Sequence, residues 1–217
     1  MKRILLLLLC MPIIYTYAQE EEKEVEYKSN SHSVSFMSRE GISLKKEFYS
    51  LGQIGNTGFI ELEVLLLTEI LIPEKTGVID NKIGCLRILN TAKLDRTPIT
   101  YIGTLDYDEL DACIKLLEYF KDNTLNKKQD TQTEYMYQTR DKVTVGFSYG
   151  YDRGRWNIFT QTKHYTSKSI QFANISNLDD MIAKFKTALD LIDNFMKGNP
   201  YHSLETEKKK RSKYDLN

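Results

Sequence analysis

Hydrophobic and polar positions follow two different periods in the first half of the chain. From residue 59 to 66, apolar residues first alternate with glutamate and then run without interruption, which is typical of a strand entering a core. Shorter β-type runs follow at residues 83–89 and 99–103. A helix is predicted to begin at Asp106, with Glu109 placed for a capping box. Its apolar stripe comprises Leu110, Cys113, Ile114, Leu117 and Phe120.

The same order of patterns recurs in the second half. Alternating apolar and polar residues predict strands at residues 134–138, 143–151, 155–162 and 167–173. Residues 152–154 supply a hairpin turn, because Gly154 is free to adopt a positive φ. Asn177 is the expected N-cap of a second helix. The apolar face of this helix comprises Leu178, Met181, Ile182, Phe185, Leu189 and Ile192.

The two halves also match residue by residue at their helices. A shift of 71 residues carries Asp106 onto Asn177, and Glu109 onto Asp180. The predicted fold class is α+β, with antiparallel β-meanders that are each followed by a covering α-helix. One interpretation is a duplicated ββββα unit at about residues 59–124 and 133–197. The other is a chance match, because helical patterns are degenerate.

Polar segments flank this predicted single domain of residues 34–197. Residues 19–33 are acidic and polar and are expected to form a flexible leader. Residues 198–217 are expected to be a disordered charged tail, with Pro200 after the last helix and a basic run at 208–211.

The first 18 residues have the pattern of a cleaved signal peptide. Lys2 and Arg3 precede an apolar run at residues 4–14, and cleavage is expected after Ala18. The run has 11 residues, whereas a helix needs about 20 to cross a bilayer. A periplasmic or secreted protein follows from this pattern. The alternative is lipid attachment at Cys10, which the large residue Leu9 before it disfavours.

Charge balance narrows the range of partners. The chain has 30 basic and 30 acidic residues, and removal of Lys2 and Arg3 leaves 28 basic residues. Nucleic-acid binding usually requires a basic excess or patch, so no nucleic-acid partner is predicted. No integral membrane segment is expected after signal cleavage.

Two cysteines, Cys85 and Cys113, belong to the mature chain. In an oxidising compartment they can form a disulfide. They can equally be two buried free thiols, because the sequence does not show whether their Cβ atoms meet.

Candidate chemistry is sparse. Asp106, Asp108, Glu109 and Asp111 form an acidic cluster, but Leu117 stands where an EF-hand loop needs its bidentate glutamate. No histidine pair has metal-ligand spacing, so no metal site and no cofactor is predicted. A nucleophile pair of Cys113 and His164 stays open, although the position of Cys113 on an apolar stripe favours an inert thiol. No catalytic residue is predicted.

One predicted hairpin gathers aromatic and arginine side chains. It contains Tyr149, Tyr151, Arg153, Arg155 and Trp156. Such residues are enriched where partners bind, because they bury much area at a small entropic cost. The strand alternation instead places some of the tyrosines in the core.

Several short segments carry a resemblance to known proteins. Besides the signal ending at Ala18, they are Ser38-Arg39-Glu40-Gly41, Gly84-Cys85-Leu86-Arg87, Gly103-Thr104-Leu105-Asp106 and Thr139-Arg140-Asp141. Over roughly residues 38–197 the chain resembles small exported proteins of unknown function from Bacteroidota-type bacteria. The resemblance implies export and assigns no activity and no site residue. At the level of fold, the pattern is similar to the four-strand-plus-helix repeats of the PUR-alpha and whirly families. Those families bind single-stranded nucleic acid, which the export signal and the balanced charge oppose here.

The resulting functional prediction is a non-enzymatic, exported binding or structural module with a protein or glycan partner. The alternative is a secreted or periplasmic hydrolase with an unrecognised active site. An enzyme would need a concave pocket with convergent polar groups, whereas a binding module would present an exposed aromatic patch or a free sheet edge.

Overall fold

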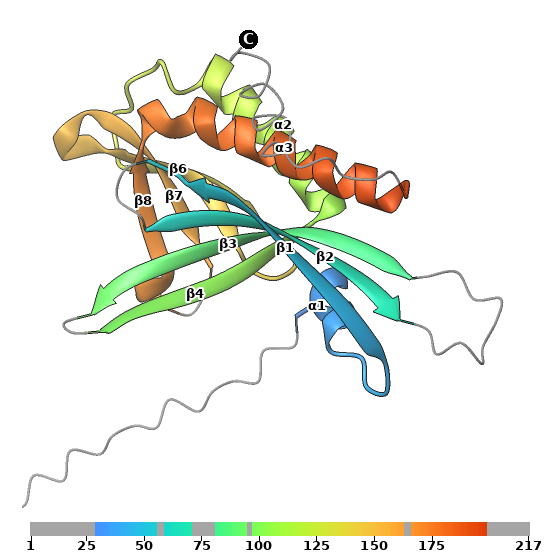
Figure 1. The fold of residues 1–217 in the computed structure, drawn as a ribbon. Coiled ribbons are helices and arrows are strands. Elements are labelled where there is room, and N and C mark those ends of the chain that lie inside the picture. Colours follow the sequence, from blue (N-terminus) through green and yellow to red (C-terminus); the bar gives the residue numbers. More distant parts are fainter. Residues whose placement is uncertain (1–28, 56–58, 71–80, 95–96, 163–165, 199–217) are drawn as a thin grey trace, which may run out of the picture.

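Two four-stranded antiparallel sheets follow one another along the chain, and each is followed by a long helix (Figure 1). The computed structural model describes residues 29–55, 59–70, 81–94, 97–162 and 166–198. The predicted α+β class is confirmed. Both halves also have the predicted ββββα order, as a duplicated unit would.

The bounds of the elements are as follows. Helix α1 (His32–Met37) precedes the first unit. The first unit comprises β1 (Ser43–Gln53), β2 (Ile60–Ile70), β3 (Lys82–Leu94), β4 (Thr97–Asp106) and α2 (Tyr107–Asn123). The second unit comprises β5 (Thr133–Gln138), β6 (Thr144–Gly150), β7 (Arg155–Gln161), β8 (Ile170–Asn174) and α3 (Leu178–Met196). Within each sheet the strands pair in chain order, as in a simple meander.

The hydrophobic pattern predicted neither helix α1 nor strand β1, and β1 moves the start of the first unit from residue 59 to Ser43. It lies at the edge of its sheet, paired only with β2 among the described strands. None of its residues is fully buried. An edge strand of this kind lacks the strong apolar alternation that marks a strand in sequence.

Helices α2 and α3 lie side by side on one face of the first sheet (Figure 1). Their predicted apolar stripes are buried in one core with the inner faces of both sheets. Phe120 connects α2 to the second sheet. The centre of its ring lies 4.7 Å from that of Tyr135 in a stacked arrangement, and 5.8 Å from that of Phe147 in an edge-on arrangement. Burial against two sheets stabilises these helices more than their intrinsic propensity does.

The two helix starts follow the predicted cap positions. The Glu109 carboxylate accepts the Asp106 backbone N–H at 3.1 Å, as a capping box requires. Asn177 occupies the N-cap position of α3, but its side chain donates to the Asn174 carbonyl at 3.2 Å instead of capping the helix.

Helix α1 covers part of the opposite face of the first sheet (Figure 1). Phe36 packs there against Leu65, Leu67 and Cys85. The folded part of the chain therefore starts before residue 34. Ser31 and Ser33, which the sequence placed in the flexible leader, are fully buried because both bind the Asp106 carboxylate.

Several predictions concern residues that the structure does not describe. The signal peptide, its cleavage site, most of the leader, residues 199–217 and His164 all lie outside the described ranges. Among the residues that are described, no helix combines the length and apolar character needed to cross a membrane.

Candidate functional site

A cluster of hydrogen-bonded charges fastens α1 to the end of β4. We call Ser31, His32, Ser33, Asp106, Asp108, Glu109 and Arg140 the Asp106 junction. The Asp106 side chain is only 2% exposed. It accepts hydrogen bonds from the Ser31 hydroxyl (2.9 Å), the Ser33 hydroxyl (2.5 Å) and the backbone N–H of His32 (2.7 Å). These bonds satisfy a buried carboxylate that burial alone would penalise.

Arg140 brings a positive charge to the three carboxylates of the junction. Its guanidinium donates to Asp106 Oδ2 at 3.0 Å and to both oxygens of Asp108 at 2.6 and 2.8 Å. The backbone N–H of Arg140 also donates to Glu109 Oε1 at 2.6 Å. The planar, forked guanidinium suits this role because it binds carboxylates at two points.

The environment shifts the pKa values of the three carboxylates in the junction. Burial raises the pKa of Asp106, but hydrogen bonds from Ser33, His32 and Ser31 outweigh burial and lower it below 3.8. Hydrogen bonding to Arg140 lowers the pKa of Asp108. Burial raises the pKa of Glu109 above 4.5, partly offset by backbone hydrogen bonds from Arg140 and Asp106.

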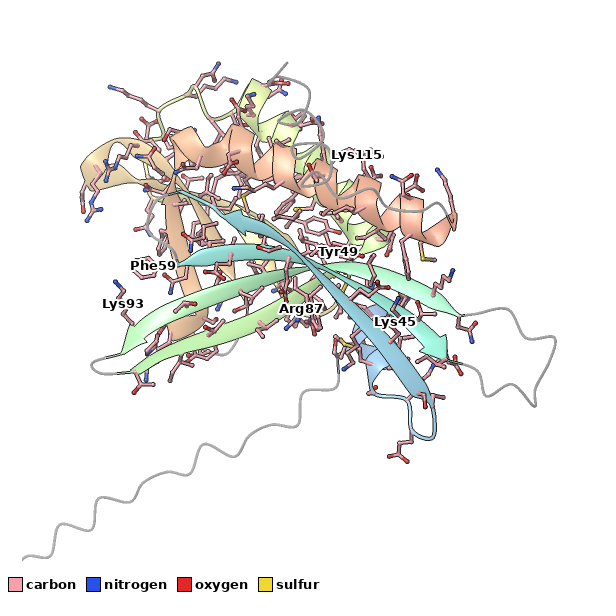
Figure 2. The ribbon with its side chains drawn as sticks, in the orientation of Figure 1. Lys45, Tyr49, Phe59, Arg87, Lys93 and Lys115 are labelled. Carbon is pink, nitrogen blue, oxygen red and sulfur yellow. The ribbon has the colours of Figure 1, made fainter. Side chains whose placement is uncertain are left out.

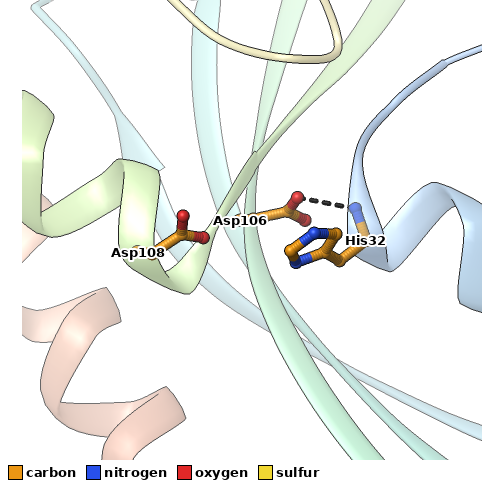
Figure 3. Close-up of side chains that lie close together, drawn as sticks. All are labelled: His32, Asp106 and Asp108. Carbon is orange, nitrogen blue, oxygen red and sulfur yellow. Dashed lines mark hydrogen bonds between the residues drawn. The ribbon is translucent and has the colours of Figure 1, made fainter.

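The junction also contains the one set of side chains among the described residues with a metal-like arrangement. Ligand atoms of His32, Asp106 and Asp108 lie within 4.8 Å of one another (Figure 3). The Arg140 guanidinium already bridges the two carboxylates and supplies the positive charge that a cation would. Asp111, the fourth residue of the predicted acidic cluster, lies apart and pairs with Lys115 at 2.6 Å. The geometry therefore assigns the junction a structural role.

The two cysteines are free thiols and lie in separate hydrophobic clusters. Cys85 is under α1 on the outer face of the first sheet, whereas Cys113 faces the main core from α2. The disulfide that the sequence left open is therefore not formed. Burial raises the pKa of both thiols to about 12, so both stay protonated at neutral pH.

The predicted binding hairpin divides into core and surface residues. Tyr149 and Trp156 are 3% and 5% exposed and contact each other edge-on at 5.0 Å. Trp156 also donates its indole N–H to the Lys127 carbonyl at 3.1 Å. Arg153 and Arg155 are exposed, and the side chain of Tyr151 is not among those described. The binding role of this hairpin stays a prediction for the arginines, while the two buried aromatic residues pack the core.

A groove lies beside α1 on the outer face of the first sheet, away from α2 and α3. It has a volume of about 430 Å³. We call it the α1 groove. Its lining residues are Val34, Met37, Lys46, Phe48, Leu65, Arg87, Ile102, Thr104 and Asp141. The volume falls within the roughly 300–1,000 Å³ typical of ligand pockets.

Alternation along the strands decides which side chains reach this groove. Arg87 lies on the side of the sheet away from the helices, whereas Tyr49 lies on the helix side and packs against the main core (Figure 2). The Arg87 guanidinium lies 5.4 Å from the centre of the Phe48 ring and pairs with Glu63 at 2.6 Å. Phe48 is nevertheless 53% exposed, and Ile102 is 41% exposed. Large apolar side chains that stay exposed on a sheet face in this way are candidates for partner contact.

Asp141 of the α1 groove is connected to the Asp106 junction through Ser29 and Thr104, which both hydrogen-bond to Ser31. Its carboxylate accepts from the Ser29 hydroxyl at 2.6 Å and from the backbone N–H and hydroxyl of Thr104 at 3.0 and 2.9 Å. The register of β3 and β4 places Cys85 directly opposite Asp106, and Arg87 directly opposite Thr104.

Sequence reasoning did not assign the groove residues, although one signal for them was present. Three of the short segments named above, residues 84–87, 103–106 and 139–141, supply Arg87, Thr104 and Asp141 to the groove. The exposed Phe48 belongs to β1, the strand that the pattern did not predict.

Comparison with protein-family models and with curated proteins finds no match to this chain.

Proposed function

We propose that the protein is an exported, non-enzymatic binding module that holds a segment of a partner protein in the α1 groove. One observation carries the proposal: Phe48 is 53% exposed within a groove of about 430 Å³ that the two long helices leave uncovered. A ring exposed in this way loses apolar contact with water when a partner covers it.

The lining favours a polypeptide as the occupant. Val34 and Met37 are half-buried and provide an apolar surface above the buried Leu65, and the exposed Ile102 of β4 extends this surface. Lys46 is exposed beside this surface. An acidic residue next to the apolar side chains of the partner would form an ion pair with it.

The described residues support a binding role over an enzymatic one. Both thiols are buried with raised pKa values, which makes them poor nucleophiles. The carboxylates of Asp106 and Asp108 are held by Arg140 and by α1, so they are engaged in structure.

Export is the second part of the proposal. It is supported by the signal-peptide pattern of residues 1–18 and by the resemblance to exported proteins. Fractionation of the native cell followed by mass spectrometry tests it. We expect the mature protein to begin at Gln19 and to be found outside the cytoplasm. A lipid on Cys10 or an uncleaved chain in the cytoplasm would contradict this part.

Site-specific photo-cross-linking in the native cell tests the groove. A photoreactive residue replaces Phe48 in one variant and Tyr119 in a control variant. Tyr119 is a suitable control because it is 59% exposed on α2, on the other side of the sheet. We expect a discrete cross-linked protein from position 48 and none from position 119. Equal cross-linking at both positions, or none at position 48, would exclude docking in this groove.

A further inference from the structure

A second pocket lies between Ile54 and Gly55, which follow β1, and the corner where β8 leads into α3. It has a volume of about 300 Å³. We call it the Phe172 pocket. Its lining residues are Ile54, Gly55, Phe172, Ala173, Asn174, Ser176 and Asn177. Among these described lining residues none carries a charge, in a chain of which 28% is charged. The described lining therefore offers no counter-charge to an ionic ligand.

Phe172 lines the pocket and is the exposed end of a row of side chains that supports its ring. On the outer face of the second sheet, register places Met136, Gly146, Phe159 and Phe172 in one row across the four strands. The absence of a side chain at Gly146 leaves room for the Phe159 ring, since a Cβ there would lie 3.0 Å from Phe159 Cε1. Phe159 is buried, and its ring centre lies 6.2 Å from that of Phe172. Phe172 itself is 53% exposed. Its ring therefore has the Phe159 ring as a neighbour and is still accessible to solvent.

The polar groups of the pocket are held in place by the backbone. Asn174 Oδ1 accepts the Ser176 N–H at 3.0 Å, and Asn177 Nδ2 donates to the Asn174 carbonyl at 3.2 Å. These bonds orient the two amides, while the Asn174 amide nitrogen, the Asn177 amide oxygen and the exposed Ser176 hydroxyl stay available as donors and acceptors.

Gly55 lines the pocket opposite the β8–α3 corner, close to Asn177. Its φ of +71° is a conformation that residues with a side chain rarely adopt. A Cβ at this position would also lie 3.1 Å from Asn177 Nδ2. Glycine therefore allows the β1 turn to approach the amide of Asn177 closely.

We propose that the Phe172 pocket binds a neutral saccharide. The C–H face of a sugar ring is apolar and weakly positive, so it packs on the electron-rich face of a phenyl ring. Sugar hydroxyls donate and accept at once, which matches oriented amides and a hydroxyl. A neutral sugar also leaves no charge to compensate in an uncharged pocket.

The surroundings agree with a neutral ligand. Lys184, a nearby charged group, binds Asp180 at 2.8 Å and the Gln53 carbonyl at 2.6 Å, so its charge is already compensated. The Phe172 pocket is distinct from the α1 groove, because the two share no lining residue. The saccharide proposal therefore stands or falls independently of partner binding at α1.

Calorimetry on the mature protein tests the proposal. The probes are neutral gluco-, xylo- and chito-oligosaccharides, with an oligogalacturonate and a random neutral peptide mixture as competing classes. Phe172→Ala is compared with Met136→Ala. Met136 is a matched control, because it is also 53% exposed and lies in the same row at the other edge of the sheet.

We expect at least one neutral oligosaccharide to bind, roughly tenfold more weakly to Phe172→Ala and unchanged to Met136→Ala. Circular dichroism checks that Phe172→Ala is folded. Ser176→Lys, which puts a charged chain into the pocket from an exposed site, gives a second variant with the same expected loss. The proposal is overturned if no neutral oligosaccharide binds, if only the anionic sugar or the peptides bind, or if the two alanine variants bind alike.

Discussion

The Arg140 guanidinium lies 3.0 Å from Asp106 Oδ2, although the two residues are 34 positions apart in the chain. This contact links the end of β4, where Asp106 also holds α1, to the turn that follows β5. The first unit, the second unit and the N-terminal helix thus meet at the Asp106 carboxylate, which pairs with Arg140 and accepts hydrogen bonds from Ser31, His32 and Ser33. The Asp106 carboxylate is buried. Removing the positive charge of Arg140 beside it should therefore lower the stability of the whole domain.

Replacing Arg140 with alanine tests this link. We expect the free energy of unfolding to fall by about 2–3 kcal/mol, because Asp106 would be left buried without its cation. Urea denaturation measures the change. Arg155→Ala is the control, since Arg155 is exposed, and should lie within about 0.5 kcal/mol of the wild type. Equal stability of the two variants would show that the ion pair contributes little.

Stability should depend on acid pH through Asp106. The folded-state pKa of Asp106 is lower than 3.8, so the unfolded chain takes up this proton first as pH falls. The contribution of Asp106 to the free energy of unfolding is present above pH 3.8. It is lost as the pH falls through the lower, folded-state pKa of this carboxyl. Glu109 has a folded-state pKa raised above 4.5, so the folded chain takes up its proton first as the pH falls. Protonation of Glu109 therefore adds stability and partly offsets the loss at Asp106.

Asp106→Asn isolates the Asp106 contribution to this pH dependence. We expect the variant to be less stable at neutral pH and to lose less stability between about pH 5 and pH 2 than the wild type. Urea unfolding at a series of pH values gives both curves. Parallel curves would mean that the carboxylate of Asp106 titrates alike in the folded and unfolded chain.

The two thiols should be unreactive in the folded protein. Burial raises the pKa of both Cys85 and Cys113 to about 12, so little thiolate exists near pH 8. We expect the mature protein to react with a thiol reagent only after denaturant is added, and then at two sites. Ser38→Cys provides an exposed control that should react at once. A mature protein that shows no free thiol in denaturant would contain the disulfide that this structure lacks.

Trp156 and the hairpin arginines should have separable effects. Trp156→Ala removes a buried ring and a hydrogen bond, and we expect it to cost about 3–5 kcal/mol of stability. A double Arg153→Ala and Arg155→Ala variant should unfold within about 1 kcal/mol of the wild type, because both side chains are exposed. Thermal unfolding followed by the fluorescence of the remaining aromatic residues compares them. A large loss in the arginine variant would assign these residues to the fold.

The elements with a buried face were predictable from sequence. The stripes of α2 and α3 could be recognised because a helix that covers a sheet must repeat its apolar residues every three to four positions. The cap at Asp106 was also visible, because the residue types at Asp106 and Glu109 suit the first turn of a helix. Strand β1 and helix α1 were not predictable, since β1 buries no residue fully and α1 buries only Ser33 and Phe36.

The sequence by itself determined the class of fold, the order of the two units and the positions where their helices begin, because periodicity and capping are local properties. The tertiary structure decided which long-range groups meet: Asp106 with Arg140, Phe48 with Arg87, and Gly55 with the amide of Asn177. It also separated Cys85 from Cys113 on opposite faces of one sheet. These outcomes depend on strand register and on which face each residue occupies, and a shift of one residue would reverse every face.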